Sequence, residues 1–591
     1  MIKLLAYNCT DLANKEGELS SYSHRTHTCG ELGAKHIGQE VTLCGWLQYQ
    51  RNKNFYILRD WHGITQAYVE KNDIIDKLYF ESVIKLKGEV RVRVSPNKEM
   101  KTGEIEVLAK EIEILNPAKQ SLPFEVKDNQ EHNEVLRLQH RYLDIRKNSM
   151  QRNLRMRSQV LMKIREFLCT NHNFVDVETP TLFKRTSGGA QEFVVPTQTP
   201  GAFYSLPQSP QQFKQLLMAG GIDRYFQIAR CYRDESLGPE RQPEFTQVDI
   251  EMSFTDQEKV RKLIEDMLVY SWPLEEIQAP FQRFTYDEAM TMYGTDKPDA
   301  RFDFKIQDVT DVLQEKVELF RFIETTPETD KSKPSAKNSI QIIVVPQTAD
   351  RFTNSQIQNY DDMKTWSSTI TRHIDPDALS SICNKCDVKP NDIVFISSGQ
   401  EYQPHAVLGK IRLLMADLLE SRDVVVRDLD VYQFLWIYDF PLFCPKEDGS
   451  GLDSSHHPFT APVEKDKELL KTDPLKAKGQ HYDLVVNGVE IGGGSMRIHN
   501  SELQKFVLDE ILKEDSTEFQ HLLEALASGC PPHGGIALGF DRLMSLICKT
   551  KNIRDVIAFP KSSEGKDLMS GAPSQISRKD LDNYHISVKD Y

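Results

Sequence analysis

The segment RCYRDESLGPERQPEFTQVDIEMSF, from Arg230 to Phe254, gathers charges that could handle anionic substrates. Alternating arginines and acids open the segment, a loop with glycine and proline follows, and carboxylates two residues apart close it. The planar guanidinium of arginine donates paired hydrogen bonds to carboxylates and phosphates, so the pattern suits phosphoryl or carboxyl chemistry. A solvated charge run is the alternative interpretation, and it stands for Glu244 and Glu251.

Three other segments, one before this stretch and two after it, have a similar density of polar residues. They read LPQSPQQFKQLLMAGG, YDLVVNGVEIGGGSMRIHN and PPHGGIALGFDRLMSL. Their candidate site residues are Ser209, Gln211, Lys214, Asp483, Glu490, Arg497 and Arg542. The sequence contains neither a P-loop nor a dinucleotide-binding fingerprint, so a nucleotide site of either kind is not expected.

Strands are expected to dominate the first part of the chain. The stretches EVTLCGWLQYQ, FYILRDWHGITQAYV, SVIKLKGEVRVRV and GEIEVLAKEIEIL have strand character and are separated by turn-forming residues. Several short strands within about a hundred residues predict a small barrel. An OB-fold is favoured because its sheet face commonly binds single-stranded nucleic acid, and a barrel with a purely structural role is the alternative.

Helices and mixed structure are expected after the barrel. Apolar residues at helical spacing predict a basic amphipathic helix that ends near Asn171. Between the Arg230–Phe254 segment and YDLVVNGVEIGGGSMRIHN, the stretch IQIIVVPQ predicts a buried strand and HAVLGKIRLLMADLLESR predicts a helix. Together they indicate an inserted domain. The expected divisions are a leader or disordered tail (1–24), a barrel (25–125), a hinge (126–150), a catalytic domain (151–295 and 425–561), an inserted domain (296–424) and a C-terminal extension (562–591).

The composition is that of a soluble globular protein with several domains. The 591 residues are 39% hydrophobic and 27% charged, and no apolar run reaches the roughly eighteen residues of a transmembrane helix. The net charge of −14 argues against non-specific nucleic-acid binding by the whole surface, which needs a dense positive field. The ten scattered cysteines favour a reducing compartment, and the Cys383–Cys386 pair lacks the second pair that a structural zinc site needs.

Taken in order, the polar segments resemble the class II aminoacyl-tRNA synthetases, and within them the aspartyl branch. FVDVETP is similar to the first motif of that class, RCYRDE with RQPEFTQVDIE to the second, and GIALGFDRL to the third. QSPQQFKQLLM, HHPFT and VEIGGGSMRIHN are typical of the aspartyl branch, and the resemblance runs from about residue 25 to residue 561. It implies an α+β fold with an N-terminal OB-fold β-barrel, an antiparallel-sheet catalytic domain and an inserted α/β domain of the bacterial and mitochondrial type.

The resemblance also implies an activity and its partners. The enzyme would activate L-aspartate with ATP and Mg²⁺, and would transfer the aspartyl group to the 3′ end of tRNA-Asp in protein synthesis. A homodimer joined through the first motif is implied, and no membrane. Attack of a carboxylate on the α-phosphate brings two anions together, so the site must neutralise charge and align the reactants.

The resemblance assigns roles at the nucleotide end of the site. Arg233 would bridge the substrate carboxylate and the α-phosphate, Arg542 would hold the γ-phosphate, and Glu490 with Asp483 would bind Mg²⁺. Phe245 would stack under adenine. The implied catalytic residues are Arg233, Glu490 and Arg542, and the implied ATP-binding residues are Arg233, Asp234, Glu235, Gln242, Phe245, Glu490, Gly539, Phe540, Asp541 and Arg542.

The resemblance assigns an aspartate pocket and an anticodon surface as well. Arg497, aided by Lys214, would pair with the substrate β-carboxylate, and His456 would close over it. Gly188 departs from the glutamate of bacterial members, so a contact to the substrate ammonium is missing or supplied by Asp249. The implied aspartate-binding residues are Gly188, Ser209, Gln211, Lys214, Arg233, Asp249, His456 and Arg497, and the implied anticodon-reading residues are Arg51, Phe55 and Gln66.

Several alternatives remain open. Gly188 and QYQRNKNF are similar to mitochondrial members, which favours an enzyme of the mitochondrial matrix over one of a bacterial cytoplasm. The enzyme could also charge tRNA-Asn. A relative that activates asparagine or makes an amide is disfavoured by the cations Lys214 and Arg497, and a non-catalytic RNA-binding protein by the retention of Arg233, Glu490 and Arg542.

Overall fold

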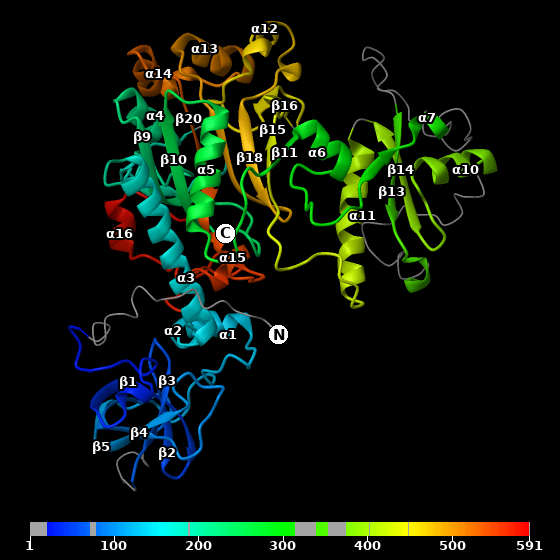
Figure 1. Cartoon of the computed structure of the whole chain (residues 1–591). Helices are drawn as coiled ribbons and strands as arrows, with labels where there is room; N and C mark the ends of the chain where they lie inside the picture. Colours follow the sequence, from blue (N-terminus) through cyan, green and yellow to red (C-terminus); the bar gives the residue numbers. More distant parts are fainter. Residues whose placement is uncertain are drawn as a thin grey trace.

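The computed structural model describes residues 21–70, 78–186, 189–313, 338–352, 374–400, 402–446 and 448–589. Figure 1 shows a small barrel at one end, a large central domain, and a further domain beside it. Most of the expected leader and the candidate Gly188 lie outside the described residues. The domain boundaries expected from the sequence stay predictions.

The barrel closes in the strand order β1-β2-β3-β5-β4. Its strands are β1 (Glu40–Asn52), β2 (Phe55–Arg59), β3 (Ile64–Tyr68), β4 (Val83–Val92) and β5 (Ile105–Asn116). In β4 every second residue from Ile84 to Val90 is buried, which is the pattern of a strand with one face toward a core. Gly88 lets β5 approach, because an added Cβ would lie 2.3 Å from the Leu108 carbonyl oxygen. The predicted OB-fold barrel is confirmed.

Short helices join the barrel to the central domain. They are α1 (Glu134–Gln139), α2 (Arg141–Asp144) and α3 (Asn148–Arg165), and α3 continues in a wider turn to Asn171, where the sequence predicts the helix to end. Arg155 of α3 lies over the ring of Trp61 in the barrel, 4.1 Å from its centroid. Arg146 donates to Glu81 of the barrel at 3.0 Å. These contacts attach the barrel to the base of α3.

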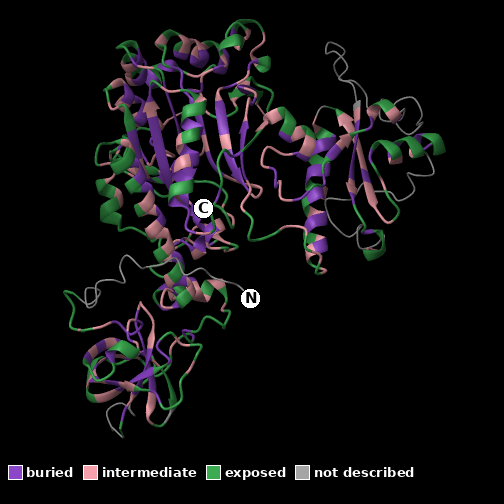
Figure 2. Cartoon of the chain, viewed as in Figure 1, coloured by how far each residue is buried: buried purple, intermediate pink, exposed green. Residues whose placement is uncertain are grey.

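An eight-stranded sheet forms the central domain, in the order β11-β15-β18-β19-β20-β10-β9-β6. Neighbouring strands are antiparallel except for the parallel pairs β11/β15 and β6/β9. The strands are β6 (Val175–Asp176), β9 (Arg224–Tyr232), β10 (Glu244–Ser253), β11 (Gln282–Thr285), β15 (Phe434–Tyr438), β18 (His481–Val486), β19 (Val489–Met496) and β20 (His533–Gly539). Figure 2 shows that the central strands are largely buried.

Helices α3, α5 (Gln257–Ser271) and α15 (Phe540–Ile547) pack against this sheet and form the main core. The core includes Ile164, Ile264 and Phe540 from the three helices, and Val248 and Ile250 from β10. Because strand residues alternate in direction, Asp249, which lies between these two, points to the other face of the sheet, as do the residues two positions before and after it. That face carries the site described below.

The inserted domain has a three-stranded antiparallel sheet, β12-β13-β14, between two helices. Its elements are β12 (Ile306–Asp308), β13 (Asn338–Val345), β14 (Ile393–Gln400), α10 (Pro376–Lys385) and α11 (Gln403–Glu420). The predicted strand IQIIVVPQ and the predicted helix HAVLGKIRLLMADLLESR correspond to β13 and α11. Buried Arg412 of α11 donates to the backbone carbonyls of Asp299, Phe302 and Phe304, which fixes the segment that enters the domain.

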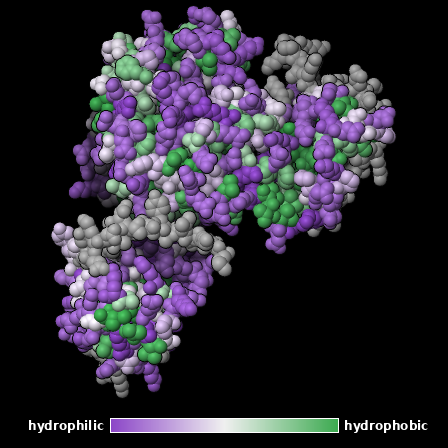
Figure 3. Space-filling model, in the orientation of Figure 1, coloured by the Kyte–Doolittle hydropathy of each residue, from purple (hydrophilic) through white to green (hydrophobic). Residues whose placement is uncertain are grey.

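Shorter elements complete the chain. They are β7 (Val194–Pro196), β8 (Phe203–Ser205), α4 (Gln211–Ala219), α6 (Tyr286–Tyr293), α7 (Thr310–Leu313), β16 (Phe443–Pro445), β17 (Leu452–Ser454), α12 (Leu469–Thr472), α13 (Ser501–Phe506), α14 (Gln520–Ala527) and α16 (Arg578–Asn583). The face in Figure 3 is mainly hydrophilic, with hydrophobic residues gathered on the barrel and beside α11. Within the described ranges, no helix has the length and apolar character needed to cross a membrane.

Candidate active site

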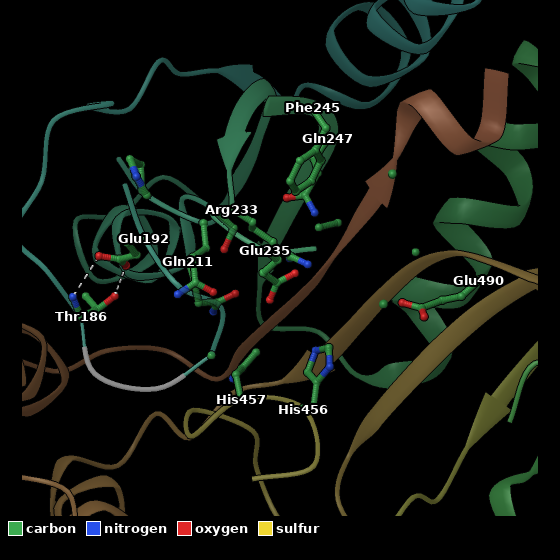
Figure 4. A pocket seen from close by; sticks show the side chains of 18 of the residues that line it. Thr186, Glu192, Gln211, Arg233, Glu235, Phe245, Gln247, His456, His457 and Glu490 are labelled. Carbon is green, nitrogen blue, oxygen red and sulfur yellow. Dashed lines mark hydrogen bonds between the residues drawn. The ribbon is translucent and has the colours of Figure 1, made fainter. Parts of the chain in front are cut away.

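A cavity of about 820 Å³ opens on the sheet face that β10 turns away from the main core. Residues of β10, β19, β20 and the first turns of α4 line it, together with neighbouring loops, among them the one that follows β9. Its size suits a nucleotide and a small amino acid together. Figure 4 shows Phe245 of β10, Glu490 of β19 and Arg233, which follows β9, pointing into this space.

The four polar segments of the sequence meet in this cavity. The residues singled out from the sequence that line it are Ser209, Gln211, Lys214, Arg233, Glu235, Gln242, Phe245, His456, Glu490, Arg497, Gly539, Asp541 and Arg542. Asp234, Asp249, Asp483 and Phe540 are not among the lining residues. The roles expected for all of them stay predictions.

Strand alternation places the side chains of β10. Phe245, Gln247, Asp249 and Glu251 share one face of the strand, two residues apart. Phe245 and Gln247 line the open part of the cavity, whereas Asp249 and Glu251 are fully buried beneath it. The antiparallel pairing of β10 with β9 brings Arg233 beside this face, because its backbone N–H donates to the Pro243 carbonyl at 2.9 Å.

Aromatic and cationic groups meet at the end of the cavity where the nucleotide is expected, called the nucleotide end below. The Arg233 guanidinium lies 5.2 Å from the ring centroid of Phe245. Gln242 is engaged by the chain itself, since its amide oxygen accepts from the backbone N–H of Lys561 at 2.7 Å and its amide nitrogen donates to the Lys561 carbonyl at 3.1 Å. The amide therefore fixes the C-terminal segment against the loop between β9 and β10.

Phe540 and Asp541, which were expected to bind the nucleotide, are held by contacts within the protein. Phe540 is fully buried in the main core, with Arg157 over its ring at 4.8 Å. The Asp541 carboxylate accepts from Arg157 at 2.6 Å and from the backbone N–H of Thr246 at 2.8 Å. Asp234 is exposed on the loop, where its backbone N–H donates to Gln191. The side chain of Phe540 therefore supports the cavity wall from behind.

A buried ion-pair quartet lies at the other end of the cavity. Lys214 Nζ lies 2.8 Å from Asp249 Oδ1 and 3.2 Å from Glu251 Oε2. Arg497 donates from Nε to Glu251 Oε1 at 3.0 Å and from Nη2 to Oε2 at 3.2 Å. The four side chains are almost completely buried, and their two positive and two negative charges cancel.

The interpretation of Glu251 as a solvated surface charge is wrong, because the side chain is fully buried. Burial alone would raise its pKa, but Arg497 and Lys214 lower the pKa of Glu251 to about 2, so it is ionised at neutral pH. Its backbone pairs with Gly535, which leaves space for the carboxylate because an added Cβ would lie 2.3 Å from Oε2. Glu244, in contrast, lies at the rim in partly exposed pairs with Arg230 and Lys561, as expected for a surface charge.

Asp249 is less accessible than the sequence prediction requires. It is fully buried, one oxygen is bound to Lys214, and burial raises its pKa despite that cation. Its second oxygen, Oδ2, has no hydrogen-bond partner in the described part of the chain, although Tyr225 lies beside it. Asp249 therefore first orients Lys214, and Oδ2 is the atom through which it could take a substrate ammonium.

Two adjacent histidines cover the quartet, and only the first was expected. His457 contacts Arg497 Nη1 through Nε2, while Ser495 Oγ accepts from the same nitrogen at 2.6 Å. His456 stacks on His481 with ring centroids 5.3 Å apart. Burial and the neighbouring Arg497 lower the pKa of His457 well below its usual range, and burial with His481 does the same for His456. Both rings are neutral at neutral pH and point into the cavity in Figure 4.

Carboxylates gather beside the nucleotide end. Glu490 forms an ion pair with Lys297 at 2.8 Å, and its backbone carbonyl accepts from Arg542 Nη1 at 3.0 Å. Burial and the neighbouring Glu490 and Asp296 raise the pKa of Asp483 well above its usual range. Asp483 pairs with Gly493 across β18 and β19, and an added Cβ at Gly493 would lie 2.7 Å from Asp483 Oδ1.

These carboxylates fit one kind of metal binding. Among the described residues, no group of three or more His, Cys, Asp or Glu side chains is arranged to hold a metal ion. Mg²⁺ commonly takes one or two carboxylates and completes its coordination with water and substrate phosphates. Glu490 and Asp483 suit such a shared site and do not suit a cage made by protein alone.

The described residues of a loop, 183–186 and 189–192, border the cavity, and they include residues that the sequence reasoning missed. Glu192 accepts from Thr186 Oγ1 at 2.6 Å, as Figure 4 shows. The Gln208 amide clamps the loop backbone, donating to the Ala190 carbonyl at 2.7 Å and accepting from its N–H at 2.8 Å. Glu192, Gln208, Gln247 and His457 all line the cavity. The available signals were the position of Glu192, four residues after Gly188, and that of His457, directly after His456.

The three expected anticodon residues lie together on the barrel. Phe55 packs edge to face on Tyr68, with ring centroids 5.1 Å apart. Arg51 Nη1 donates to Gln66 Oε1 at 3.4 Å. Gln66 is 3% exposed and donates to Glu106 at 2.8 Å, so its amide is already engaged. Phe55 and Arg51 are accessible to a ligand, whereas Gln66 would have to exchange partners to read a base.

Comparisons with known proteins place the chain in a family. A model described as tRNA synthetases class II (D, K and N) matches residues 133–563, and one described as an OB-fold nucleic acid binding domain matches residues 41–115. The mitochondrial aspartate–tRNA ligase of Rattus norvegicus is 49% identical, with 99% of this chain and 93% of that protein covered. The aspartate–tRNA(Asp/Asn) ligase of Dictyoglomus turgidum is 42% identical, with 95% and 98% covered.

Solved structures show the same fold at lower identity. Asparaginyl-tRNA synthetase from Pyrococcus horikoshii, complexed with asparaginyl-adenylate, superposes with a TM-score of 0.57 at 18% identity, covering 91% of this chain and 98% of that one. Identity at this level supports the fold alone. The matched synthetase model and the full-length relatives establish more, and the chain belongs to the class II aminoacyl-tRNA synthetases, in the family of the aspartate–tRNA ligases.

Proposed function

We propose that the enzyme joins L-aspartate to ATP as aspartyl-adenylate, with release of pyrophosphate, and then transfers the aspartyl group to the 3′ end of tRNA-Asp. The observation that carries the proposal is the buried quartet of Lys214, Arg497, Asp249 and Glu251 at one end of a cavity whose other end holds Arg233 and Arg542. One end suits a side-chain carboxylate and the other a triphosphate.

In adenylate formation, each charged residue of the cavity would bind a different group of the two substrates. The substrate α-carboxylate attacks the α-phosphorus, and the bond to pyrophosphate breaks. Arg233 would bind the substrate carboxylate and the α-phosphate together and lower their repulsion. Phe245 provides a face for adenine, and Arg542 a cation for the terminal phosphate. Glu490 and Asp483 would hold Mg²⁺, which neutralises phosphate charge when it is bound.

Selection of aspartate over asparagine follows from the hydrogen-bond donors of Lys214 and Arg497. Lys214 and Arg497 present only N–H groups, which a carboxylate accepts and an amide NH₂ group does not. Glu251 holds the guanidinium of Arg497 in place through two hydrogen bonds, so the donors are oriented before the substrate arrives. Ser209, Gln211 and Asp249 Oδ2 would accept hydrogen bonds from the substrate ammonium.

The remaining proposals concern partners and location. The barrel would bind unstacked anticodon bases, with Phe55 as a stacking surface and Arg51 as a donor. Two copies would pair through the first motif, whose strand β6 lies at the edge of the large sheet. The mitochondrial relatives support a mitochondrial location. The relative named for both tRNA-Asp and tRNA-Asn makes charging of tRNA-Asn the second candidate function.

Pyrophosphate–ATP exchange without tRNA tests the activation step. We expect exchange with aspartate and little with asparagine, and we expect Arg233→Ala to abolish it. Arg230→Ala is the matched control, because Arg230 lies three residues before Arg233, near the end of β9, in an exposed pair with Glu244. Normal exchange in Arg233→Ala, or a preference for asparagine, would overturn the proposal. Aminoacylation of tRNA-Asp and tRNA-Asn transcripts then decides between the two candidate functions.

A further inference from the structure

Lys297 is a cation at the nucleotide end that the proposed reaction leaves without a role. Its ammonium lies 2.8 Å from Glu490 Oε2. Lys297 belongs to the segment GTDKPDAR, residues 294–301, which leaves α6 and leads to β12 of the inserted domain. The entry to the inserted domain therefore contacts a carboxylate proposed to hold Mg²⁺.

Packing on two sides fixes the backbone near Lys297. Arg412 of the inserted domain, 1% exposed, donates to the Asp299 carbonyl at 2.8 Å. On the other side, the β18–β19 turn approaches so closely that an added Cβ at Gly488 would lie 3.2 Å from Asp299 Cβ. Glu490 follows Gly488 by two residues, so this contact also sets how far Lys297 must reach.

The pair of Lys297 and Glu490 differs from the quartet in its exposure. Its two side chains are 41% and 28% exposed, whereas those of Lys214 and Glu251 are 2% and 0% exposed. Exposed ion pairs are held weakly, and a small divalent cation concentrates more charge on a carboxylate than an ammonium does. The quartet is therefore built to persist, and the pair at Glu490 is built to exchange.

We propose that Lys297 is a resident counter-cation of the nucleotide site. Its ammonium holds Glu490 while no divalent cation is bound, and binding of that cation displaces it toward the phosphates of ATP. The flexible four-carbon stem of lysine allows this movement, and its ammonium binds phosphate as a point charge. The inference rests on the proposed function for the identity of the metal and the nucleotide.

Metal and nucleotide binding should respond to Lys297 in opposite directions. In Lys297→Met, Mn²⁺ titrated into the full-length enzyme without nucleotide and followed by electron paramagnetic resonance should bind about fivefold more tightly, or about 1 kcal/mol. Binding of α,β-methylene-ATP in EDTA should weaken by a similar factor. Lys305→Met is the matched control, because Lys305 forms an exposed pair with Asp303 near the start of the same domain, and it should change neither affinity.

A merely structural role would weaken both affinities. Mn²⁺ binding that is unchanged, weaker or undetectable in Lys297→Met would therefore overturn the inference. Lys297→Arg keeps the charge and should behave like the unmodified enzyme in both titrations, and a Met-like result for it would also overturn the inference. Aspartate-dependent exchange by the unmodified enzyme is scored separately, so its absence alongside the two opposite shifts would reject the proposed function and leave the role of Lys297 standing.

Discussion

Glu251→Gln should destabilise the floor of the aspartate pocket while keeping its shape. Glu251 accepts two hydrogen bonds from Arg497 and lies 3.2 Å from Lys214 Nζ. The amide keeps one acceptor oxygen, but it turns an NH₂ group toward cations that have no acceptor to offer. Arg497 and Lys214 are then left buried with Asp249 as their remaining carboxylate.

The pKa of Glu251 gives the magnitude. Its fall from 4.5 to about 2 corresponds to about 3 kcal/mol of preference for the ionised form, which is the lower end for breaking a buried ion pair. Because the pKa is lower in the folded state, this stabilisation is present above about pH 4.5 and is lost as the pH falls toward 2. At neutral pH the substitution should therefore remove all of it.

Hydrogen exchange of the β10 amides at neutral pH measures this loss locally. A fall of about 3 kcal/mol in the opening free energy should speed exchange more than about a hundredfold. Glu244→Gln is the control on the same strand, and its exposed pairs should contribute under about 1 kcal/mol. The KM for aspartate should rise while that for ATP stays. Equal exchange in the two variants would refute the reasoning.

Three further predictions test other parts of the molecule. Burial lowers the pKa of His481 to about 3, so stability should fall by about 1.4 kcal/mol per pH unit below 6.5, and His481→Phe should remove that slope in urea unfolding at about pH 7 and about pH 5. Gly493→Ala should push Asp483 aside and slow pyrophosphate exchange about a hundredfold with little loss of stability, and normal exchange would contradict it. Arg412→Met leaves three backbone carbonyls without their donor and should lower the stability of the inserted domain by about 3 kcal/mol. Limited proteolysis should therefore cut this domain faster in Arg412→Met than in the control Arg422→Met, and equal digestion of the two variants would count against the prediction.

The sequence predicted the barrel, the inserted domain and thirteen of the residues that line the cavity. The barrel follows from alternation within strands such as β4, and the helix through Asn171 from apolar spacing, because both patterns are local. The residues lining the cavity were predicted from the family resemblance, because the motifs of the family include the positions of groups that face a ligand. Arg233, Glu490 and Arg542 were found in that way, although they come from three distant segments.

The residues that sequence reasoning missed depend on contacts between distant parts of the chain. Glu251 reads as a surface charge until Arg497, 246 positions later, supplies its partner. Lys297 lies at the edge of a segment assigned to another domain, and its ion pair with Glu490, together with the packing of Asp299 on Gly488, shows that it reaches the site. Gln66 seemed free to read a base, yet Glu106 from a parallel neighbour of its strand engages it.

In the proposed reaction, the two ends of the cavity solve opposite electrostatic problems. At the aspartate end, two cations must stay in place before a single charge arrives, and burial among Asp249 and Glu251 keeps them there without a net charge. At the nucleotide end, a triphosphate and its metal ion must enter and pyrophosphate must leave, so permanent neutralisation would hinder turnover. Glu490 accordingly remains at the surface in a pair that can be exchanged. Selection therefore depends on the buried groups, and release depends on the exposed ones.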